Sequence, residues 1–355
     1  MTGAMYAAIA GLKAHMSKMN VIGNNIANVN TNGYKTQRTV FKDAMYTMYS
    51  KGSDGSAEHG GKNPSQVGYG SQISSIDLDM HTGTYTLGRG TDCMIYGDGF
   101  FMVGSKDLTD GFSGTNPDTL KSVQLTRVGD FEFKSDGYLC DGNGNPVYGF
   151  LTTGVDATGK VTLSDQLVPI RLPRTEKNAE GKMEVKYPVQ EGNERLHDYE
   201  PDKDLPTVKL DSISINPDTG AITGTDKNTD QMITIGYLAI ANVTNPNGVT
   251  HTNGFYYKAG DGAGDLDVSM LGGQAEQFEN FEYVNGSLAD GEKPDKMKIG
   301  SAGGTNLMTG GLEGSNVDLA SEISEMITTQ RGYQANTRII TVTDSMLEEL
   351  VNIKR

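Results

Sequence analysis

Both ends of the chain carry apolar side chains that recur at steps of three and four residues. In the first thirty residues this spacing predicts one amphipathic helix with an apolar stripe: Met5, Ile9, Leu12, Met16, Met19, Ile22 and Ile26. The last forty residues predict a second helix with heptad-compatible apolar positions: Leu319, Ile323, Met326, Tyr333, Ile340, Leu347 and Val351. A 4–3 repeat held over about three heptads is typical of a coiled-coil seam, and an exposed apolar stripe usually marks an assembly surface.

Polar residues predict where the first helix ends. Residues 28–33 read Asn-Val-Asn-Thr-Asn-Gly, and Asn and Gly adopt the left-handed conformation that closes helices. Asn24, Asn25, Asn28 and Asn30 are unusually polar for a helix end. We expect these side chains either to cap the helix or to form hydrogen bonds between subunits.

The two ends differ in charge. Residues 1–42 contain five basic side chains and no acidic one, whereas residues 311–355 contain seven acids and four bases. Asn316 and Asp318 are candidate N-caps of the second helix, and Glu322 lies where a carboxylate meets the positive end of the helix dipole. Opposite charge beside two apolar stripes favours pairing of the terminal helices as an α-helical coiled coil. The alternative is that both helices pack on a globular core.

Between about residues 70 and 310 the pattern changes to short strands and turns. Ten Asn-Gly or Asp-Gly pairs lie between Asp98 and Gly291, and each is a strong turn signal. Residues 131–139 predict a hairpin. Further strands are expected at 100–103, 123–125, 208–215 and 233–243. Many short strands with glycine-rich turns predict an antiparallel sandwich or barrel.

The predicted fold class is therefore α+β, with paired terminal helices and a central antiparallel all-β domain. The expected parts are an N-terminal helix of an inner α domain at 1–42, a connector at 43–69, a β domain at 70–310 and a C-terminal helix of the inner α domain at 311–355. The connector is rich in Gly and Ser, which predicts a flexible or partner-ordered segment. Within the β domain, residues 174–206 hold 15 charged residues of 33, so we expect a polar insertion that buries little.

Composition excludes several classes of partner. Thirty Lys and Arg against 45 Asp and Glu give a net charge of −15, so we expect no nucleic acid as a partner. Direct membrane insertion is not expected either, because no stretch approaches the roughly 18 consecutive apolar residues that a membrane span needs. The N-terminal apolar stretch has no basic segment before it, so we expect no cleaved signal peptide.

The sequence shows no catalytic or cofactor-binding motif. The five histidines are scattered singly, and Cys93 and Cys140 are too few for a four-ligand zinc site, so we interpret both as ordinary small strand residues. Residues 141–145 imitate the start of a calcium loop, but Pro146 occupies the position that needs glycine, so a turn is expected. We therefore expect no enzyme activity, no cofactor and no metal.

Motifs at both ends resemble one protein family. Residues 20–35 (NVIGNNIANVNTNGYK) closely resemble the signature of bacterial flagellar rod and hook proteins. Residues 311–319 (GLEGSNVDL) are similar to that family's entry to its last helix. The helix itself is matched by residues 326–336 (MITTQRGYQAN) and 349–355 (ELVNIKR).

The centre of the chain matches the family less closely. Residues 88–92 and 97–101 resemble the segment that begins the family's β domain. The resemblance is strong over about 1–50 and 305–355, and it is absent over 174–206. Two long motifs at opposite ends and in the right order identify the chain as a member of the family.

The resemblance implies a structural axial protein of the bacterial flagellum. Members of this family leave the cell unfolded through the flagellar type III export apparatus and polymerise into a hollow helical tube. Their terminal helices pair into an inner α domain, and the β domain forms the outer layer. The implied partners are further copies of the chain, the distal rod, hook-cap and hook–filament junction proteins, and the export apparatus. The implied location is the flagellar basal body and hook, extracellular after export.

Within the family, residues 21–25, 330–336 and 349–355 look nearest to hook proteins, so we expect the hook, which couples the rod to the filament and transmits torque. The distal rod protein is the alternative, because residues 174–206 are smaller and more polar than the further outer domain of many hook proteins. A secreted surface adhesin or binding module is a second alternative. We expect subunit assembly to depend on Met5, Ile9, Leu12, Met16, Met19, Asn24, Asn25, Ile26, Asn28, Leu319, Ile323, Met326, Tyr333, Ile340 and Leu347.

Overall fold

The computed structural model describes residues 2–55, 60–105, 123–155, 161–164, 167–178, 182–188, 206–228, 230–264, 266–271, 282–283, 298–301 and 305–353. The chain forms two compact units. The helical unit comprises residues 1–30, 35–79 and 316–355, and the β unit comprises residues 31–34 and 80–315.

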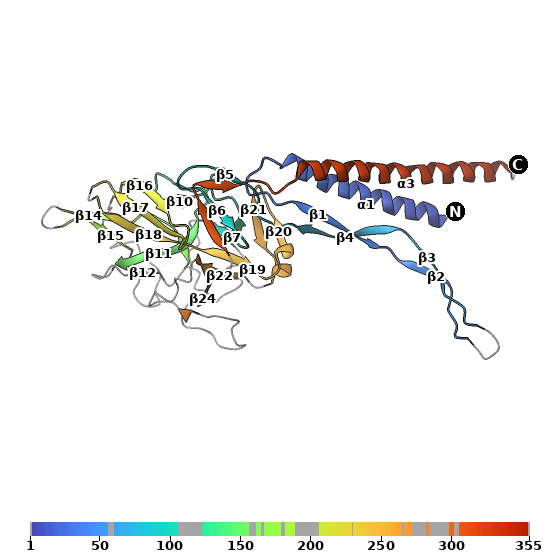
Figure 1. Ribbon diagram of the computed structural model, residues 1–355, viewed down its shortest axis with the longest axis horizontal. Coiled ribbons are helices and arrows are strands. Elements are labelled where there is room, and N and C mark those ends of the chain that lie inside the picture. The colour runs from blue at the N-terminus through green and yellow to red at the C-terminus, as the bar shows by residue number, and fades with distance from the viewer. Residues whose placement is uncertain are drawn as a thin grey trace. The chain divides into compact units, whose positions relative to one another are not determined.

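Two long helices dominate the helical unit. In Figure 1, α1 (Thr2–Ala27) and α3 (Leu319–Ile353) lie side by side. α1 ends where the sequence predicts, because the Asn28 N–H donates to the Asn24 and Asn25 carbonyls at 3.1 and 3.2 Å. Gly33 then has a φ of 69°, in the left-handed region that glycine adopts without strain. Both predicted terminal helices are therefore confirmed.

Asp318 caps the N-terminus of α3. Its carboxylate accepts hydrogen bonds from the Ala320 N–H at 3.0 Å and from the Ser321 hydroxyl at 2.6 Å. Both bonds lower the pKa of Asp318, and the bond from Ser321 has the larger effect. Of the two predicted N-caps, Asp318 is confirmed, and Glu322 lies in the first turn as expected.

Two antiparallel strand pairs complete the helical unit. β1 (Gln37–Asp43) pairs with β4 (Ser71–Leu78), and β2 (Tyr46–Ser50) pairs with β3 (Ser65–Gly68). The sequence predicts a connector over 43–69, and the structure gives part of it regular strands. Tyr, Thr and Val, which favour strands, flank the Gly- and Ser-rich residues 52–61, and the average composition of the segment hides them. Residues 56–59 of the connector lie outside the described residues.

Two large sheets form most of the β unit. Across the six-stranded sheet the order is β12 (Val161–Leu163), β11 (Tyr148–Val155), β18 (Met232–Leu238), β17 (Ala221–Asp226) and β16 (Leu210–Ile215), with β13 (Val168–Pro169) paired to β11. Across the eight-stranded sheet the order is β20 (Val249–His251), β21 (Tyr256–Ala259), β8 (Gln124–Thr126), β7 (Phe100–Val103), β19 (Ile240–Val243), β22 (Leu266–Met270), β24 (Lys298–Ser301) and β23 (Glu282–Tyr283). Short 3-10 helices, η1 (Pro246–Gly248) and η2 (Asp261–Ala263), precede β20 and β22.

The β unit also contains smaller strand pairs. They are β9 (Glu132–Phe133) with β10 (Leu139–Cys140), β14 (Arg174–Lys177) with β15 (Met183–Lys186), β25 (Asn306–Thr309) with β6 (Cys93–Tyr96), and β26 (Gly311–Glu313) with β5 (Tyr85–Leu87). The β9–β10 pair confirms the hairpin predicted over 131–139. Part of the expected polar insertion forms the β14–β15 hairpin, while its residues 179–181 and 189–205 lie outside the described residues.

The other predicted strands are present, with two differences. The apolar run 233–243 forms two strands instead of one, because β18 joins the six-stranded sheet and β19 joins the eight-stranded sheet. Pairing among the described strands is antiparallel except at β24, which lies parallel to β22 and β23. Apolar periodicity predicts that a residue is buried, but it does not show which sheet the residue enters.

One apolar core joins the two large sheets. Phe101 and Ile240 of the eight-stranded sheet belong to the same buried cluster as Leu151 and Ile222 of the six-stranded sheet. Phe101 also meets Phe131 edge to face, with ring centroids 4.9 Å apart. The predicted α+β class with a central antiparallel β-rich region is therefore confirmed. Neither described helix is long and apolar enough to cross a membrane.

Candidate assembly surface

The helices α1 and α3 approach each other closely at two glycines. A Cβ atom on Gly11 would lie 2.7 Å from Asn336 Nδ2, and one on Gly332 would lie 2.8 Å from the His15 ring. Residue numbers rise along α1 as they fall along α3, so the pairing is antiparallel. The distance between packed helices depends on the side chains at the contact, and glycine permits the shortest approach.

Polar side chains fix the register of this pairing. Lys18 Nζ lies 3.0 Å from Glu325 Oε2. Asn25 is fully buried, and its Nδ2 donates to Glu322 Oε1 at 3.0 Å and to the Gln37 carbonyl at 2.9 Å. The Asn25 Oδ1 accepts from the Gln37 N–H at 3.1 Å. Asn25 therefore joins α1 both to α3 and to the first residue of β1.

Asn316 makes a comparable connection just before α3. Its Oδ1 accepts from the N–H and the hydroxyl of Thr36 at 2.8 and 2.7 Å, and its Nδ2 donates to the Asp79 carbonyl at 2.8 Å. The sequence suggested a helix cap for Asn316. The structure instead shows a bridge between three segments of the helical unit that are distant in sequence.

Two titratable groups lie between the helices. Burial raises the pKa of Glu322; the hydrogen bond from Asn25 opposes this rise, and the nearby Glu325 carboxylate adds to it. Burial also lowers the pKa of His15, and the Lys18 ammonium lowers it further. Both groups are therefore shifted toward their neutral forms, as desolvation requires.

The predicted apolar stripe of α1 is only partly covered within the chain. Ala8, Gly11 and Asn25 are buried, whereas Met5 and Met16 are 37% and 51% exposed. Of the other predicted residues on this stripe, Ile22 is buried, and Ile9, Leu12, Met19 and Ile26 are half-buried. The buried positions of α1 thus include small and polar residues, and the large side chains of Met5 and Met16 are left at the surface.

α3 shows the same division. Among its described side chains, Thr329 and Thr343 are the buried ones. The predicted residues Leu319, Ile323, Tyr333 and Leu347 are exposed, while Met326 and Ile340 are half-buried. The sequence pattern favours pairing of the two apolar stripes. The close contacts described above join glycine, histidine, asparagine and charged side chains of the two helices. The half-buried Met326 and Ile340 lie on the same side of α3 as Gly332 and Asn336.

The asparagines at the end of α1 have separate roles within the chain. The Asn28 side chain donates to the Asn24 carbonyl at 2.9 Å and to Asn24 Oδ1 at 3.1 Å. These bonds satisfy polar groups of the last helical turn, as a cap does. Asn24 and Asn28 therefore close the helix, whereas Asn25 connects it to other elements.

A second exposed apolar surface lies on the strands of the helical unit. Met45, Tyr46, Met48 and Tyr49 are all at least half exposed, with Met45 at 81%, and Val67 on the paired strand β3 is also exposed. A two-stranded ribbon is marginally stable by itself in water. Covering these side chains would therefore stabilise the ribbon.

A buried ion pair, which the sequence did not suggest, lies in the β unit. The Arg127 guanidinium lies 3.6 Å from Glu313 Oε2, and both side chains are fully buried. Arg127 also donates to the Ile95 and Gly97 carbonyls at 3.2 and 2.7 Å. The Glu313 backbone carbonyl accepts from the Gly33 N–H at 2.7 Å. The pair thus lies beside the segments that follow α1 and precede α3 in the chain.

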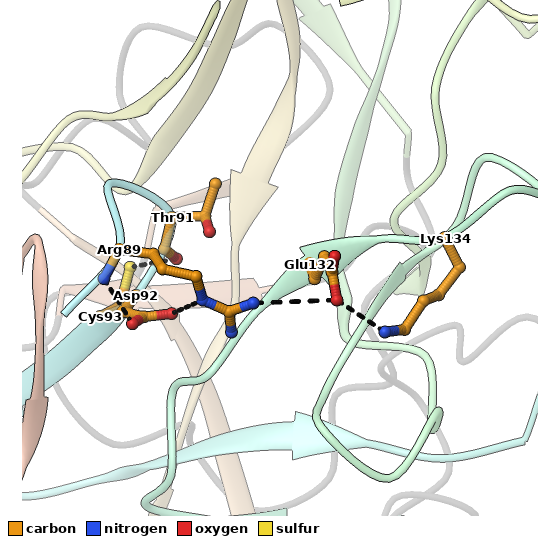
Figure 2. Close-up of polar contacts among 6 residues, drawn as sticks. All are labelled: Arg89, Thr91, Asp92, Cys93, Glu132 and Lys134. Atoms are coloured by element: carbon orange, nitrogen blue, oxygen red, sulfur yellow. Dashed lines mark hydrogen bonds and ion pairs between the residues drawn. The ribbon is translucent and has the colours of Figure 1, made fainter.

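Charged side chains form hydrogen bonds and ion pairs at the turn of residues 88–92 (Figure 2). The Arg89 N–H donates to Asp92 Oδ2 at 2.7 Å, and an Arg89 guanidinium nitrogen lies 3.8 Å from Glu132 Oε2. Lys134 Nζ contacts the same Glu132 oxygen at 2.7 Å. Exposed ion pairs contribute little to the free energy of unfolding. We therefore infer that these side chains mainly determine the shape of the turn.

The two cysteines are free thiols in strands. Cys93 in β6 and Cys140 in β10 are both buried, which confirms their interpretation as small strand residues. Burial raises the pKa of Cys93, so its thiol stays protonated and unreactive. Among the described residues, no three or more His, Cys, Asp or Glu side chains are placed to hold a metal ion.

Comparison with known proteins matches the same terminal segments. The family described as "Flagella basal body rod protein" matches residues 5–35, and "Flagellar basal body rod FlgEFG protein C-terminal" matches residues 308–353. The flagellar basal-body rod protein FlgG of Bacillus subtilis is 30% identical over 360 aligned positions that cover all of both chains. The chain belongs to the flagellar rod and hook protein family.

Rod and hook proteins both occur among its relatives. The flagellar hook protein FlgE of Borreliella burgdorferi is 27% identical over 456 positions, covering all of both chains. The hook protein FlgE of Salmonella typhimurium is 26% identical over 431 positions, covering 98% of this chain and 99% of the relative. The family resemblance expected from the end motifs is confirmed, and the matched ends contain most of α1 and all of α3.

Two glycines of α1 test the close approach of the helices. Gly23 has open space at its Cβ position, so Gly23→Ala should stabilise α1 by about 0.5–1 kcal/mol. Gly11→Ala should lose most of this gain, because Asn336 must move. Thermal unfolding followed by far-ultraviolet circular dichroism compares the two variants. Equal stabilisation by both would contradict the contact between Gly11 and Asn336.

Glu322 should give the helical unit a pH dependence of known sign. Its folded pKa is raised above the ordinary 4.5, so its contribution to stability is full below the unfolded pKa and is lost as pH rises through the folded pKa. Glu322→Gln keeps an acceptor for Asn25 and removes the titration. The melting temperature of wild type minus that of the variant should fall as the pH rises from below 4.5 through the folded pKa of Glu322. A constant difference would show that burial does not disfavour the carboxylate.

Proposed function

We propose that this protein is a structural axial subunit of the bacterial flagellum that polymerises into the hollow helical hook. The observation that carries the proposal is the exposed apolar surface of α1 and α3. Met5, Met16, Ile323 and Leu347 are exposed on helices that already pair with each other. Large exposed apolar surfaces mark interaction sites, and neighbouring subunits of a tube would cover this one. The names of the rod and hook relatives support the same conclusion.

In this proposal α1 and α3 pair in an inner α domain, as a coiled coil between and within subunits. Isolated helices gain most of their stability from packing, so these ends become fully ordered when neighbours bury their stripes. The predicted assembly residues, including Asn24, Asn25 and Asn28, then contribute to the inner layer. The β unit forms the outer layer, and residues 43–69 act as a connector.

The hook must bend while it transmits torque. Continuous packing of the inner helices would supply torsional stiffness, because packed interiors resist deformation. The β unit would slide against its neighbours through its polar surface. Its own core is buried around residues such as Phe101 and Leu151, so sliding would not expose that core.

The distal rod protein is the second candidate, and one observation favours it. The alignment with the rod protein of Bacillus subtilis spans 360 positions, close to the 355 residues of this chain, whereas the hook alignments above span 456 and 431. The hook stays first because its motifs at residues 21–25 and 330–336 are the closer match. A secreted adhesin built on the β unit is the third candidate.

The proposal includes partners and a route. The subunit is exported unfolded through the flagellar type III apparatus and acts outside the cell. It contacts its own copies, the distal rod, the hook cap and the hook–filament junction proteins. It needs no cofactor and catalyses no reaction.

Charge placed on the apolar stripe should block polymerisation. The double variant Met5→Asp, Met16→Asp should raise the critical concentration for tube formation more than about tenfold, because each buried Met contributes about 1.5–3 kcal/mol. Sedimentation of assembled tubes measures this concentration. The matched control is Val155→Asp, Met232→Asp, which changes two exposed side chains of the β unit and should assemble like wild type. Equal assembly of both double variants would show that these helices are not part of the assembly surface.

Deletion of the gene in its host separates the three candidates. Purified basal bodies are examined by electron microscopy. A complete rod without a curved hook is the expected result. Basal bodies that stop within the rod would reassign the protein to the distal rod, and normal motile flagella would contradict an axial role.

A further inference from the structure

The two helices of the helical unit differ in length. α1 has 26 residues and α3 has 35. Figure 1 shows α3 continuing past the N-terminus of α1. Thr343 is the last buried residue of α3, and all ten residues from 344 to 353 are exposed. We call residues 344–353 the α3 overhang.

The α3 overhang has an apolar face with acidic edges. Five exposed apolar side chains share one side of this helical segment: Met346, Leu347, Leu350, Val351 and Ile353. Glu349 borders this side at one edge, and Asp344 and Glu348 border it at the other. Asp344, Glu348 and Glu349 are also exposed, and no basic residue occurs between 344 and 353. Lys354 and Arg355 follow the overhang and lie outside the described residues. An amphipathic segment of this kind packs its apolar face on another apolar surface.

The exposed stripe of α1 is complementary to this segment in length and charge. From Met5 to Met16 it covers twelve residues, and the overhang covers ten, or about 18 and 15 Å at 1.5 Å per residue. Lys13 is exposed and lies four residues after Ile9 and three before Met16, so it borders the stripe on the helix surface. α1 contains no acidic residue. The acidic side chains of the α3 overhang would therefore lie next to the basic side chain of Lys13 when the overhang packs on this stripe.

We infer that the α3 overhang of one subunit packs on the Met5–Met16 stripe of a second copy of this chain, with Lys13 facing the acidic edge at Glu349. This inference rests on the proposed function, and it names the partner of the exposed stripe. The second copy is favoured over an unrelated partner because one chain carries both complementary surfaces. Heterologous contacts of this type propagate into helical assemblies.

Charge reversal tests the pairing in the full-length chain. Lys13→Glu should raise the critical concentration of tube formation about fivefold, since it replaces an attraction with a repulsion at each contact. Glu349→Lys should have a similar effect. The double variant Lys13→Glu, Glu349→Lys should return to within about twofold of wild type. Lys258→Glu, a reversal at an exposed lysine of the β unit, is the matched control and should assemble normally.

A cross-linking measurement reports the contact directly. Chains carrying Lys13→Cys are mixed with chains carrying Glu349→Cys and assembled, then oxidised. Each chain has one introduced thiol, and its native cysteines are buried, so a mixed disulfide between the introduced thiols joins two chains. The expected result is a mixed dimer that forms in tubes and not in dilute monomers.

Two results would overturn the inference. One is normal assembly of both reversal variants without cross-linking. The other is a Lys13→Glu, Glu349→Lys double variant that assembles no better than its parents. In either case wild-type chains still form tubes, so the proposed function stands. If wild-type chains form no tubes and the deletion strain keeps normal hooks and rods, the proposed function itself fails.

Discussion

The close contact between α1 and α3 is the interaction on which the exposed surface of the helical unit depends. At Gly11 and Gly332 the helices approach so closely that even a methyl group would displace a neighbour. Small and polar residues therefore line the contact, and Met5 and Met16 remain at the surface. Exposed apolar area is unfavourable in water and becomes favourable when another surface covers it. Pairing within one chain thus leaves the apolar stripes free for other subunits.

Polar bonds determine register in this arrangement, and in the proposed assembly apolar burial would supply the energy. Asn25 and Asn316 each connect segments distant in sequence, so the helices and strands of the helical unit can pair in one way only. The β unit is built differently. Its large apolar core and the buried pair of Arg127 and Glu313 stabilise it internally, and removal of one partner from such a pair is costly.

Much of this fold follows from the sequence because its signals are local. Heptad spacing predicts both helices, Asp318 predicts a cap, and Asp-Gly pairs such as Asp136-Gly137 predict turns. The face of each helix that contacts the other depends on three-dimensional fit, and a glycine such as Gly11 gives no apolar signal. The same holds for the Arg127–Glu313 pair, since its partners are far apart in sequence. The candidate assembly residues are predicted to form the seam between the helices, and seven of the fifteen are exposed within the chain.

A helical reconstruction of the assembled tube by electron cryomicroscopy tests the central claim most directly. At side-chain resolution, the inner layer should contain α1 and α3 paired through Gly11 and Gly332. The stripe from Met5 to Met16 should be buried against a neighbouring subunit. A tube whose subunits touch only through their β units, with this stripe facing water, would contradict assembly through the terminal helices.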